Sequence, residues 1–125
     1  MPIEPFTMKL RAITLDCPDP QALAAFYEQA IGLEPHPASD ADFAGLNGEA
    51  GLFIGFQRVA DHRAPRRPDP TAPQQIHLDF AVEDLDEAEA RLIELGASRP
   101  AHQPDEDRWR VLTDPAGHPF CLTGE

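Results

Sequence analysis

The sequence contains few basic residues. In 125 residues there are 10 Lys and Arg against 22 Asp and Glu, which gives a formal net charge of −12. Such an excess of negative charge repels the phosphate backbone of nucleic acids and the headgroups of anionic lipids. We therefore expect neither nucleic acid nor a membrane surface as a partner, whereas neutral and cationic small molecules remain open as ligands.

Cysteine is scarce too, because Cys17 and Cys121 are the only ones and no CxxC spacing occurs. This excludes a disulfide framework and a zinc site made of clustered cysteines. Long apolar runs are also absent, since no segment approaches the roughly 20 residues of a membrane-spanning helix. Glycine-rich phosphate loops and serine nucleophile elbows are missing as well. The sequence thus predicts a soluble, cytoplasmic protein with reduced thiols.

What the sequence does contain is an internal repeat. A strand pattern followed by a helix pattern runs past Asp19 to Gly32, and a second such pair runs past Asp84 to Gly96. The two Asp residues are 65 positions apart and the two Gly residues are 64 apart. Two copies of one unit predict a single curved sheet assembled from both, with a cleft between them.

Each copy predicts one strand, one helix and a run of further strands. Apolar residues alternate over 10–17 and over 76–82, with the period of two that is typical of a strand. Asp19 and Asp84 are good N-cap residues, and a glycine ends each helix pattern. The remaining strands are predicted at 41–47, 51–59, about 107–113 and 118–123.

The repeat also predicts the domain organisation, in which residues 8–59 form a first βαβββ module and residues 74–125 a second. Residues 1–7 lack a periodic pattern and are expected to be a flexible N-terminal arm. Residues 60–73 hold four prolines and three arginines and form the predicted connector. The three arginines of this connector are Arg63, Arg66 and Arg67. They could clamp an anionic ligand or pair with acidic residues. The simpler alternative is that the segment only links the two modules.

Three phrases carry a resemblance to a known family. They are Leu15-Asp-Cys-Pro-Asp-Pro with the following Ala-Phe-Tyr and Ile-Gly-Leu, His77-Leu-Asp-Phe-Ala-Val-Glu-Asp, and Leu112-Thr-Asp-Pro-Ala-Gly-His-Pro-Phe-Cys. Over residues 8–124 the chain resembles the vicinal oxygen chelate (VOC) superfamily, which includes glyoxalases, bleomycin-resistance proteins and extradiol dioxygenases. It looks most like the small bacterial glyoxalase-like domain proteins.

The resemblance implies an α+β fold. Two βαβββ modules are expected to form an open, cup-shaped mixed β-sheet with the helices outside. It also implies a homodimer, since many relatives complete their clefts across a two-fold axis. The superfamily hosts isomerases, lyases, dioxygenases, epimerases and drug-binding proteins on one scaffold, so the fold does not choose among these activities.

Relatives that hold a metal take one ligand from the first and one from the fourth strand of each module, usually His and Glu. In this chain those positions fall on Ala12 and near Gly55 or Gln57 in the first module, and on His77 and Cys121 in the second. Only His77 is a standard ligand in its expected place, whereas an ion needs several converging donors. We therefore expect no divalent metal and no other cofactor.

The second module supplies the main candidates for chemistry. His77 is expected to face the concave side, where it is either a general base or ligand anchor, or a hydrogen-bonded residue retained from a metal-binding ancestor. Asp16 and Asp79 share that face and either bind a cation or are solvated at the rim. Cys121 is either a nucleophile activated by His77 or an inert thiol. A metal held by His77, Cys121 and one of these acids would depart from the family pattern.

Aromatic residues suit the walls of a small-molecule cleft. Phe53, Trp109 and Phe43 are candidates to stack on a planar ligand, or else they are core residues, Phe43 above all. Tyr27 is expected to pack with its hydroxyl at the surface, and His118 to be exposed. The predicted ligand-binding residues are Asp16, Phe53, Gln57, Asp79, Trp109 and Cys121, and the predicted catalytic residue is His77.

Three functions remain open from the sequence. The first is the binding or metal-independent transformation of a small organic molecule, as in drug-resistance proteins, which the net charge and the aromatic residues favour. The second is a metal-dependent lyase, isomerase or dioxygenase of the glyoxalase type, which the resemblance and His77 favour. The third is a non-catalytic interaction module.

Overall fold

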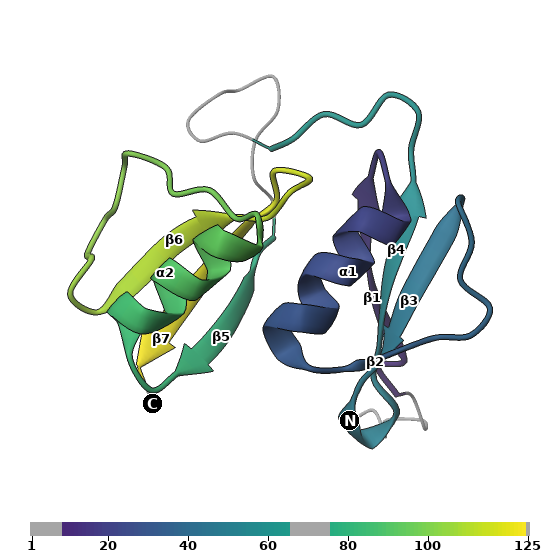
Figure 1. The fold of residues 1–125 in the computed structure, drawn as a ribbon, viewed down its shortest axis with the longest axis horizontal. Coiled ribbons are helices and arrows are strands. Elements are labelled where there is room, and N and C mark those ends of the chain that lie inside the picture. The colour runs from purple at the N-terminus through teal and green to yellow at the C-terminus, as the bar shows by residue number, and fades with distance from the viewer. Residues whose placement is uncertain (1–8, 66–75, 125) are drawn as a thin grey trace, which may run out of the picture.

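The computed structural model describes residues 9–65 and 76–124, which form two α-helices, seven β-strands and one short 3₁₀ helix (Figure 1). The predicted arm at 1–7 lies outside the described residues, as do residues 66–73 of the predicted connector with Arg66 and Arg67. Neither helix in the described ranges is long and apolar enough to cross a membrane.

The first module builds a four-stranded sheet in the order β1-β4-β3-β2. Strand β1 runs parallel to β4, whereas β3 runs antiparallel to both β4 and β2. Helix α1 packs on one face of this sheet against β3 and β4. The elements are β1 (Ala12–Cys17), α1 (Pro20–Ile31), β2 (Glu34–Pro35), β3 (Phe43–Asn47), the 3₁₀ helix η1 (Glu49–Gly51) and β4 (Phe53–Arg58).

The second module repeats this arrangement with three strands in the order β5-β7-β6. An isolated bridge between Ser98 and Thr113 stands where the first module has β2. Again the first strand is parallel to the last, and the helix packs on one face of the sheet, against β6 and β7. The elements are β5 (Leu78–Val82), α2 (Leu85–Leu95), β6 (Trp109–Thr113) and β7 (Pro119–Gly124).

Local sequence signals explain where the helices begin and end. The side chain of Asp19 accepts a hydrogen bond from the N–H of Ala22 at 3.2 Å, and Asp84 accepts one from Glu87 at 3.0 Å. Both satisfy backbone donors that a first helical turn leaves without partners. Helix α1 ends at Gly32 with φ of 83°, a left-handed conformation that glycine adopts without strain. These caps were predicted and are confirmed.

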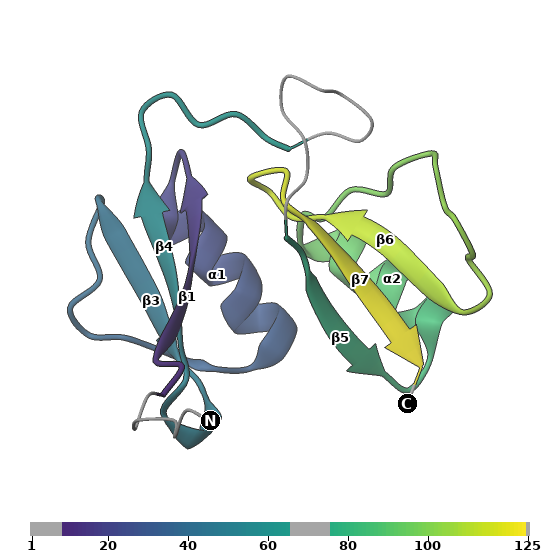
Figure 2. The same cartoon turned by 180° about the vertical axis from the view of Figure 1, so that it is seen from behind.

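Alternation along the strands divides the sheets into two faces. In β1, Leu15 and Cys17 are buried toward the helix, whereas Thr14 and Asp16 are exposed on the other side. Seen from behind the helices, β1 and β5 are the neighbouring edges of the two sheets (Figure 2). We call the side away from the helices the open face. The predicted α+β fold, an open arrangement of β-sheet built from two modules, is confirmed. The expectation of a single curved sheet is wrong, because the described strands form two separate sheets, of four and three strands.

The two modules are joined by buried contacts that the sequence did not predict. Tyr27 is 2% exposed, and its hydroxyl donates a hydrogen bond of 2.6 Å to Asp114, in the turn between β6 and β7. The expectation that this hydroxyl lies at the surface is therefore wrong. Burial, with the Asp114 carboxylate beside it, raises the pKa of Tyr27 far above its ordinary value.

The same turn holds a pair of histidines between the modules. The Nε2 atom of His118 lies 2.6 Å from the carbonyl oxygen of Asp16, so this ring is half-buried instead of exposed as expected. His62, just after β4, places its Nε2 atom 2.8 Å from the carbonyl oxygen of Ala116. The two rings are 5.3 Å apart. The turn thus ties β1 and the segment after β4 to the second module.

Helix α2 carries acidic residues on its outer side, and two of them, Asp86 and Glu89, are paired with arginines. Arg110 on β6 bonds the carboxylates of Asp86 at 2.8 Å and Glu89 at 3.3 Å, and Arg99 bonds Glu89 at 3.0 Å. The side chains of Arg110 and Glu89 are 12% and 15% exposed, so this pair is shielded from water. These contacts hold α2 against the outer edge of the second sheet.

Candidate functional site

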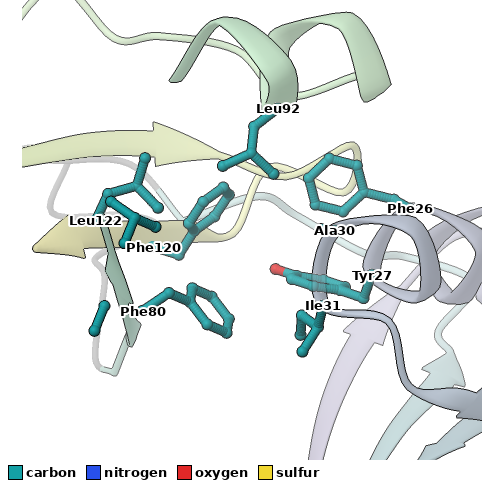
Figure 3. A pocket seen from close by; sticks show the side chains of 10 residues that line it. Phe26, Tyr27, Ala30, Ile31, Phe80, Leu92, Phe120 and Leu122 are labelled. Carbon is teal, nitrogen blue, oxygen red and sulfur yellow. The ribbon is translucent and has the colours of Figure 1, made fainter. Parts of the chain in front are cut away.

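The helix side of the molecule contains an apolar pocket of about 250 Å³ between α1 and the second sheet (Figure 3). Tyr27 is the one polar side chain in its lining, and its hydroxyl is already bonded to Asp114. Ligand sites combine apolar walls with a few polar groups that fix orientation, and this pocket lacks the latter. We therefore look for the site elsewhere. The labelled lining residues are Phe26, Tyr27, Ala30, Ile31, Phe80, Leu92, Phe120 and Leu122.

A second cavity of about 170 Å³ lies at the seam between β1 and β5. Thr14 and Asp16 line it from β1, His77 lines it from the residue before β5, and His118 lines it from the turn before β7. All four carry polar groups, so this cavity offers hydrogen-bond donors and acceptors that the apolar pocket does not. Two residues predicted from the sequence, Asp16 and His77, thus meet at one cavity although they are far apart in the chain.

Beside this seam, the structure brings together three further candidates from the second module. Asp79 and Cys121 are partners in the parallel register of β5 and β7, and His77 lies two residues before Asp79 on the same face. The Nε2 atom of His77 is 3.2 Å from Oδ1 of Asp79. One ligating atom from each of His77, Asp79 and Cys121 lies within 4.8 Å of the other two. We call these residues the His–Asp–Cys cluster.

On the first module, the open face carries a pair of stacked phenylalanines. The rings of Phe43 on β3 and Phe53 on β4 are 6.0 Å apart and nearly parallel, with an interplanar angle of 5°. We call this pair the Phe platform. Phe43 is 37% exposed, so the interpretation of Phe43 as a core residue is wrong.

Two glycines make room for the Phe platform. A Cβ atom at Gly45 would lie 1.9 Å from Cζ of Phe53, and one at Gly55 would lie 2.7 Å from Cζ of Phe43. Heavy atoms cannot approach so closely, so the rings can occupy these places only because the two positions lack side chains. Oγ1 of Thr14 would lie 3.0 Å from the same Gly55 Cβ, so the Phe platform borders a residue that lines the seam cavity.

His36, the residue after β2, is a further neighbour of the Phe platform. Its ring meets that of Phe53 edge to face, with centroids 5.4 Å apart and planes at 87°. Its Nδ1 atom accepts a hydrogen bond from the N–H of Ala38 at 3.1 Å, which fixes the ring. No sequence signal marks this contact, because it depends on the register of β2, β3 and β4.

The remaining candidates lie farther out on the open face. Gln57 is exposed near the end of β4, where it pairs with Asp16 on β1 and with Phe43 on β3. Trp109 is half-buried on β6, the outer strand of the second sheet, paired with Thr123 of β7. Gln57 therefore adjoins both the seam and the Phe platform, whereas Trp109 lies one strand beyond Cys121.

The two cysteines have different surroundings. Cys17 is fully buried on the helix side, and this burial raises the pKa of its thiol to about 11. A thiol held in the neutral form is a poor nucleophile and a poor metal ligand. Cys121 is on the opposite face of its sheet and is half-buried. Of the two thiols, that of Cys121 is therefore the one placed for chemistry on the open face.

The metal site of the wider superfamily does not fit these residues. It needs donors from both modules, and the first module offers Ala12 and either Gly55 or Gln57 at the corresponding positions. Ala12 and Gly55 have no side-chain donor, and a Cβ atom at Gly55 would lie 2.7 Å from Cζ of Phe43. Gln57 offers only a neutral amide oxygen, which is a weak substitute for a carboxylate, so the first module lacks the usual half of a four-ligand site.

Comparisons with known proteins identify the family. A family model described as a glyoxalase-like domain matches residues 12–123. The protein named "Putative glyoxylase CFP32" of Mycobacterium tuberculosis is 33% identical over 106 residues. That match covers 82% of this chain but 39% of the relative, so the chain spans about two fifths of the relative's length.

Solved structures share the fold at low sequence identity. A fosfomycin resistance protein, FosX, from Listeria monocytogenes is 20% identical with a TM-score of 0.69, and the match covers 96% of this chain and 95% of FosX. A bleomycin-binding protein from Streptomyces verticillus, solved with copper(II)-bleomycin, is 16% identical with a TM-score of 0.56, covering 96% of this chain and 98% of that protein.

At these identities the structural matches establish the fold alone, and they agree with the two-module architecture described above. The family model covers nearly the whole described chain, from the start of β1 into β7. The chain belongs to the glyoxalase-like domain family of the VOC superfamily.

Proposed function

We propose that this protein binds a small, planar organic molecule on the open face of its sheets, without the four-ligand divalent ion of metal-dependent relatives. The Phe platform is the observation that carries this proposal. Two parallel, stacked rings have room on the sheet because Gly45 and Gly55 lack side chains, and one of them is 37% exposed, so a planar ligand can extend the stack. Stacking on such a surface adds about 0.5–1.5 kcal/mol beyond the burial of area.

Charge favours a cationic or neutral ligand over an anionic one. Asp16 lines the seam cavity and Asp79 is exposed beside His77, and the whole chain carries a formal charge of −12. Aromatic faces also attract cations. A bleomycin-binding protein has the same fold, which supports a role in binding or sequestering a drug-like molecule.

Catalysis is a second candidate function, and the His77–Asp79 pair is the observation that favours it. An imidazole held 3.2 Å from a carboxylate at the edge of a cavity is the arrangement of an oriented general base. In this case the protein would be a lyase or isomerase of the glyoxalase type, acting through its own side chains. His77 would then take a proton from a molecule bound at the seam.

Calorimetric titration with planar aromatic cations and with cationic glycopeptide antibiotics tests the binding function. We expect saturable heat with at least one compound, and an affinity about tenfold lower in Phe53→Ala and Phe43→Ala, which corresponds to about 1.4 kcal/mol. Ile93→Ala is the matched control, because Ile93 is an apolar residue of α2 that is 43% exposed. Heat that survives both Phe substitutions contradicts the proposed site, because the compound then binds elsewhere. No heat with any compound contradicts the binding function and favours an interaction module.

We also propose that the protein is a cytoplasmic homodimer. The family resemblance supports the dimer, and the two thiols, Cys17 and Cys121, suit a reducing compartment. Light scattering on the purified protein tests the dimer, and a mass equal to one chain of 13.8 kDa contradicts it. Cell fractionation tests the location.

A further inference from the structure

We propose that the His–Asp–Cys cluster binds a thiophilic divalent ion such as Zn²⁺, using side chains of the second module alone. This differs from the site of metal-dependent relatives, which joins donors from both modules. It is also independent of the proposed small-molecule function, because ion binding requires neither the Phe platform nor a bound ligand.

The spacing of the three donors carries the proposal. In a tetrahedral site with Zn–N and Zn–O near 2.0 Å and Zn–S near 2.3 Å, donor atoms lie roughly 3.3–3.6 Å from one another. His77 Nε2 and Asp79 Oδ1 are already 3.2 Å apart, and the three ligating atoms all lie within 4.8 Å of one another. The ligating atoms therefore have to approach by roughly 1 Å when an ion binds, and a change of side-chain rotamer moves an atom at least that far.

The backbone holds these donors in place. Asp79 and Cys121 are register partners on adjacent strands, and adjacent strands keep a spacing near 4.8 Å. His77 comes two residues before Asp79, so its side chain emerges on the same face. A site built on paired strands loses little entropy when an ion binds, because its donors are already gathered.

The donor types select the ion. A thiolate, an imidazole nitrogen and a carboxylate suit Zn²⁺ and similar metals, whereas Mg²⁺ and Ca²⁺ prefer oxygen donors alone. On binding, the thiol proton of Cys121 is released to solvent and the thiolate bonds the ion. The thiolate and the Asp79 carboxylate then balance the double positive charge, and the charge of −12 raises the local concentration of cations.

Among residues 9–65 and 76–124, the cluster supplies three donors, and a tetrahedral ion takes four. The side chains of His77 and Asp79 are 36% and 59% exposed, so the ion would lie at the surface of the open face. His77 also lines the seam cavity. An exposed three-donor site binds more weakly than a closed structural zinc site, and it exchanges its ion with the solvent.

Titration with Co²⁺, which takes the place of Zn²⁺ and absorbs light, tests the site directly in a protein without a histidine tag. We expect one equivalent to produce a sulfur-to-cobalt charge-transfer band in the near ultraviolet, and excess Zn²⁺ to abolish it. Cys121→Ser should remove the band, and His77→Gln and Asp79→Asn should weaken binding by tenfold or more.

Matched controls separate the site from incidental binding. Asp42→Asn removes an exposed carboxylate of the first module, and we expect it to leave the titration unchanged. Persistence of the band in Cys121→Ser, or affinities of His77→Gln and Asp79→Asn equal to that of the unmodified protein, overturns the proposal.

A second measurement on the unmodified protein guards against variants that do not fold. Zn²⁺ at a concentration that saturates the cobalt competition should slow the alkylation of Cys121 by iodoacetamide at least tenfold, with mass spectrometry of peptides identifying the modified residue. Buried Cys17 serves as the internal reference, since its slow reaction should not change. An alkylation rate at Cys121 that is indifferent to Zn²⁺ overturns the proposal.

Discussion

The hydroxyl of Tyr27 donates a hydrogen bond of 2.6 Å to the carboxylate of Asp114, which is 87 residues further along the chain. Asp114 is 3% exposed and also accepts hydrogen bonds from the N–H groups of Ala116 and His118. One buried carboxylate therefore both shapes the turn between β6 and β7 and ties that turn to α1. The two modules are joined at this point by polar bonds as well as by apolar packing.

Tyr27→Phe tests how much this bond stabilises the protein. The substitution keeps the ring in the core and removes one donor from a buried carboxylate, for which we expect a loss of about 1–3 kcal/mol in the free energy of unfolding. Urea denaturation measures it. Asp114→Ala should cost more, because three donors lose their acceptor. Equal stability of Tyr27→Phe and the unmodified protein would show that the bond contributes nothing.

Alkaline pH should destabilise the fold through Cys17. Its thiol has a pKa of about 11 in the folded protein against an ordinary value of 9.0, so the unfolded chain ionises first. The contribution of the neutral Cys17 thiol to the free energy of unfolding is complete below pH 9. It is lost as the pH rises toward 11, and the loss is on the order of 2 kcal/mol. The raised pKa of Tyr27 acts in the same direction.

Urea denaturation at pH 8 and at pH 10.5, with a reductant present, measures this loss. Cys17→Ala should reduce the difference between the two pH values, although its stability at pH 8 is lower because of the cavity that it leaves. A difference of the same size in both proteins would refute the assignment to Cys17.

Gly117→Ala should be more destabilising than Gly51→Ala. Both glycines have positive φ, 88° and 81°, so alanine is strained at either position. A Cβ atom at Gly117 would in addition lie 2.4 Å from Cβ of Ala64, whereas nothing lies within 4 Å of one at Gly51. We expect an extra loss of about 1–3 kcal/mol for Gly117→Ala. Thermal unfolding compares the two variants, and equal losses would show that residue 64 does not pack on the turn.

Gly45→Ala should displace the ring of Phe53. The new Cβ atom would lie 1.9 Å from Cζ of Phe53, so the ring must leave its place over the sheet. A double-mutant cycle with Phe53→Ala measures this clash, because removing the ring first should make Gly45→Ala less costly, with a coupling of about 0.5–3 kcal/mol. Additive losses in stability would mean that the two positions do not touch.

Local sequence patterns were sufficient to predict the elements of this fold. The period of two over 10–17 placed Leu15 and Cys17 inward and Thr14 and Asp16 outward, as found. Asp19 and Asp84 marked the first turns of both helices because capping depends on neighbours only two or three residues away. The βαβββ pattern implied a strand after the first helix, but the position of β2 was not predicted, since two residues are too few to show a period.

The site was predictable only in part, because its contacts depend on register and on distant segments. Alternation placed His77 and Asp79 on one face, but nothing in the sequence showed that Cys121 lies beside Asp79. The stacking of Phe43 on Phe53 likewise requires β3 and β4 to pair in one register. The partner of Tyr27 could not be predicted, because helical periodicity shows which face points inward and not which residue it meets.

The glycine at position 55 has a further consequence for any redesign of this chain. A Cβ atom there would lie 2.7 Å from Cζ of Phe43, so a carboxylate can be introduced at 55 only if the Phe43 ring moves aside. An engineered ligand at this position would therefore need a smaller residue at 43 as well. Aromatic surface and a metal-binding side chain compete for the same space on the first sheet.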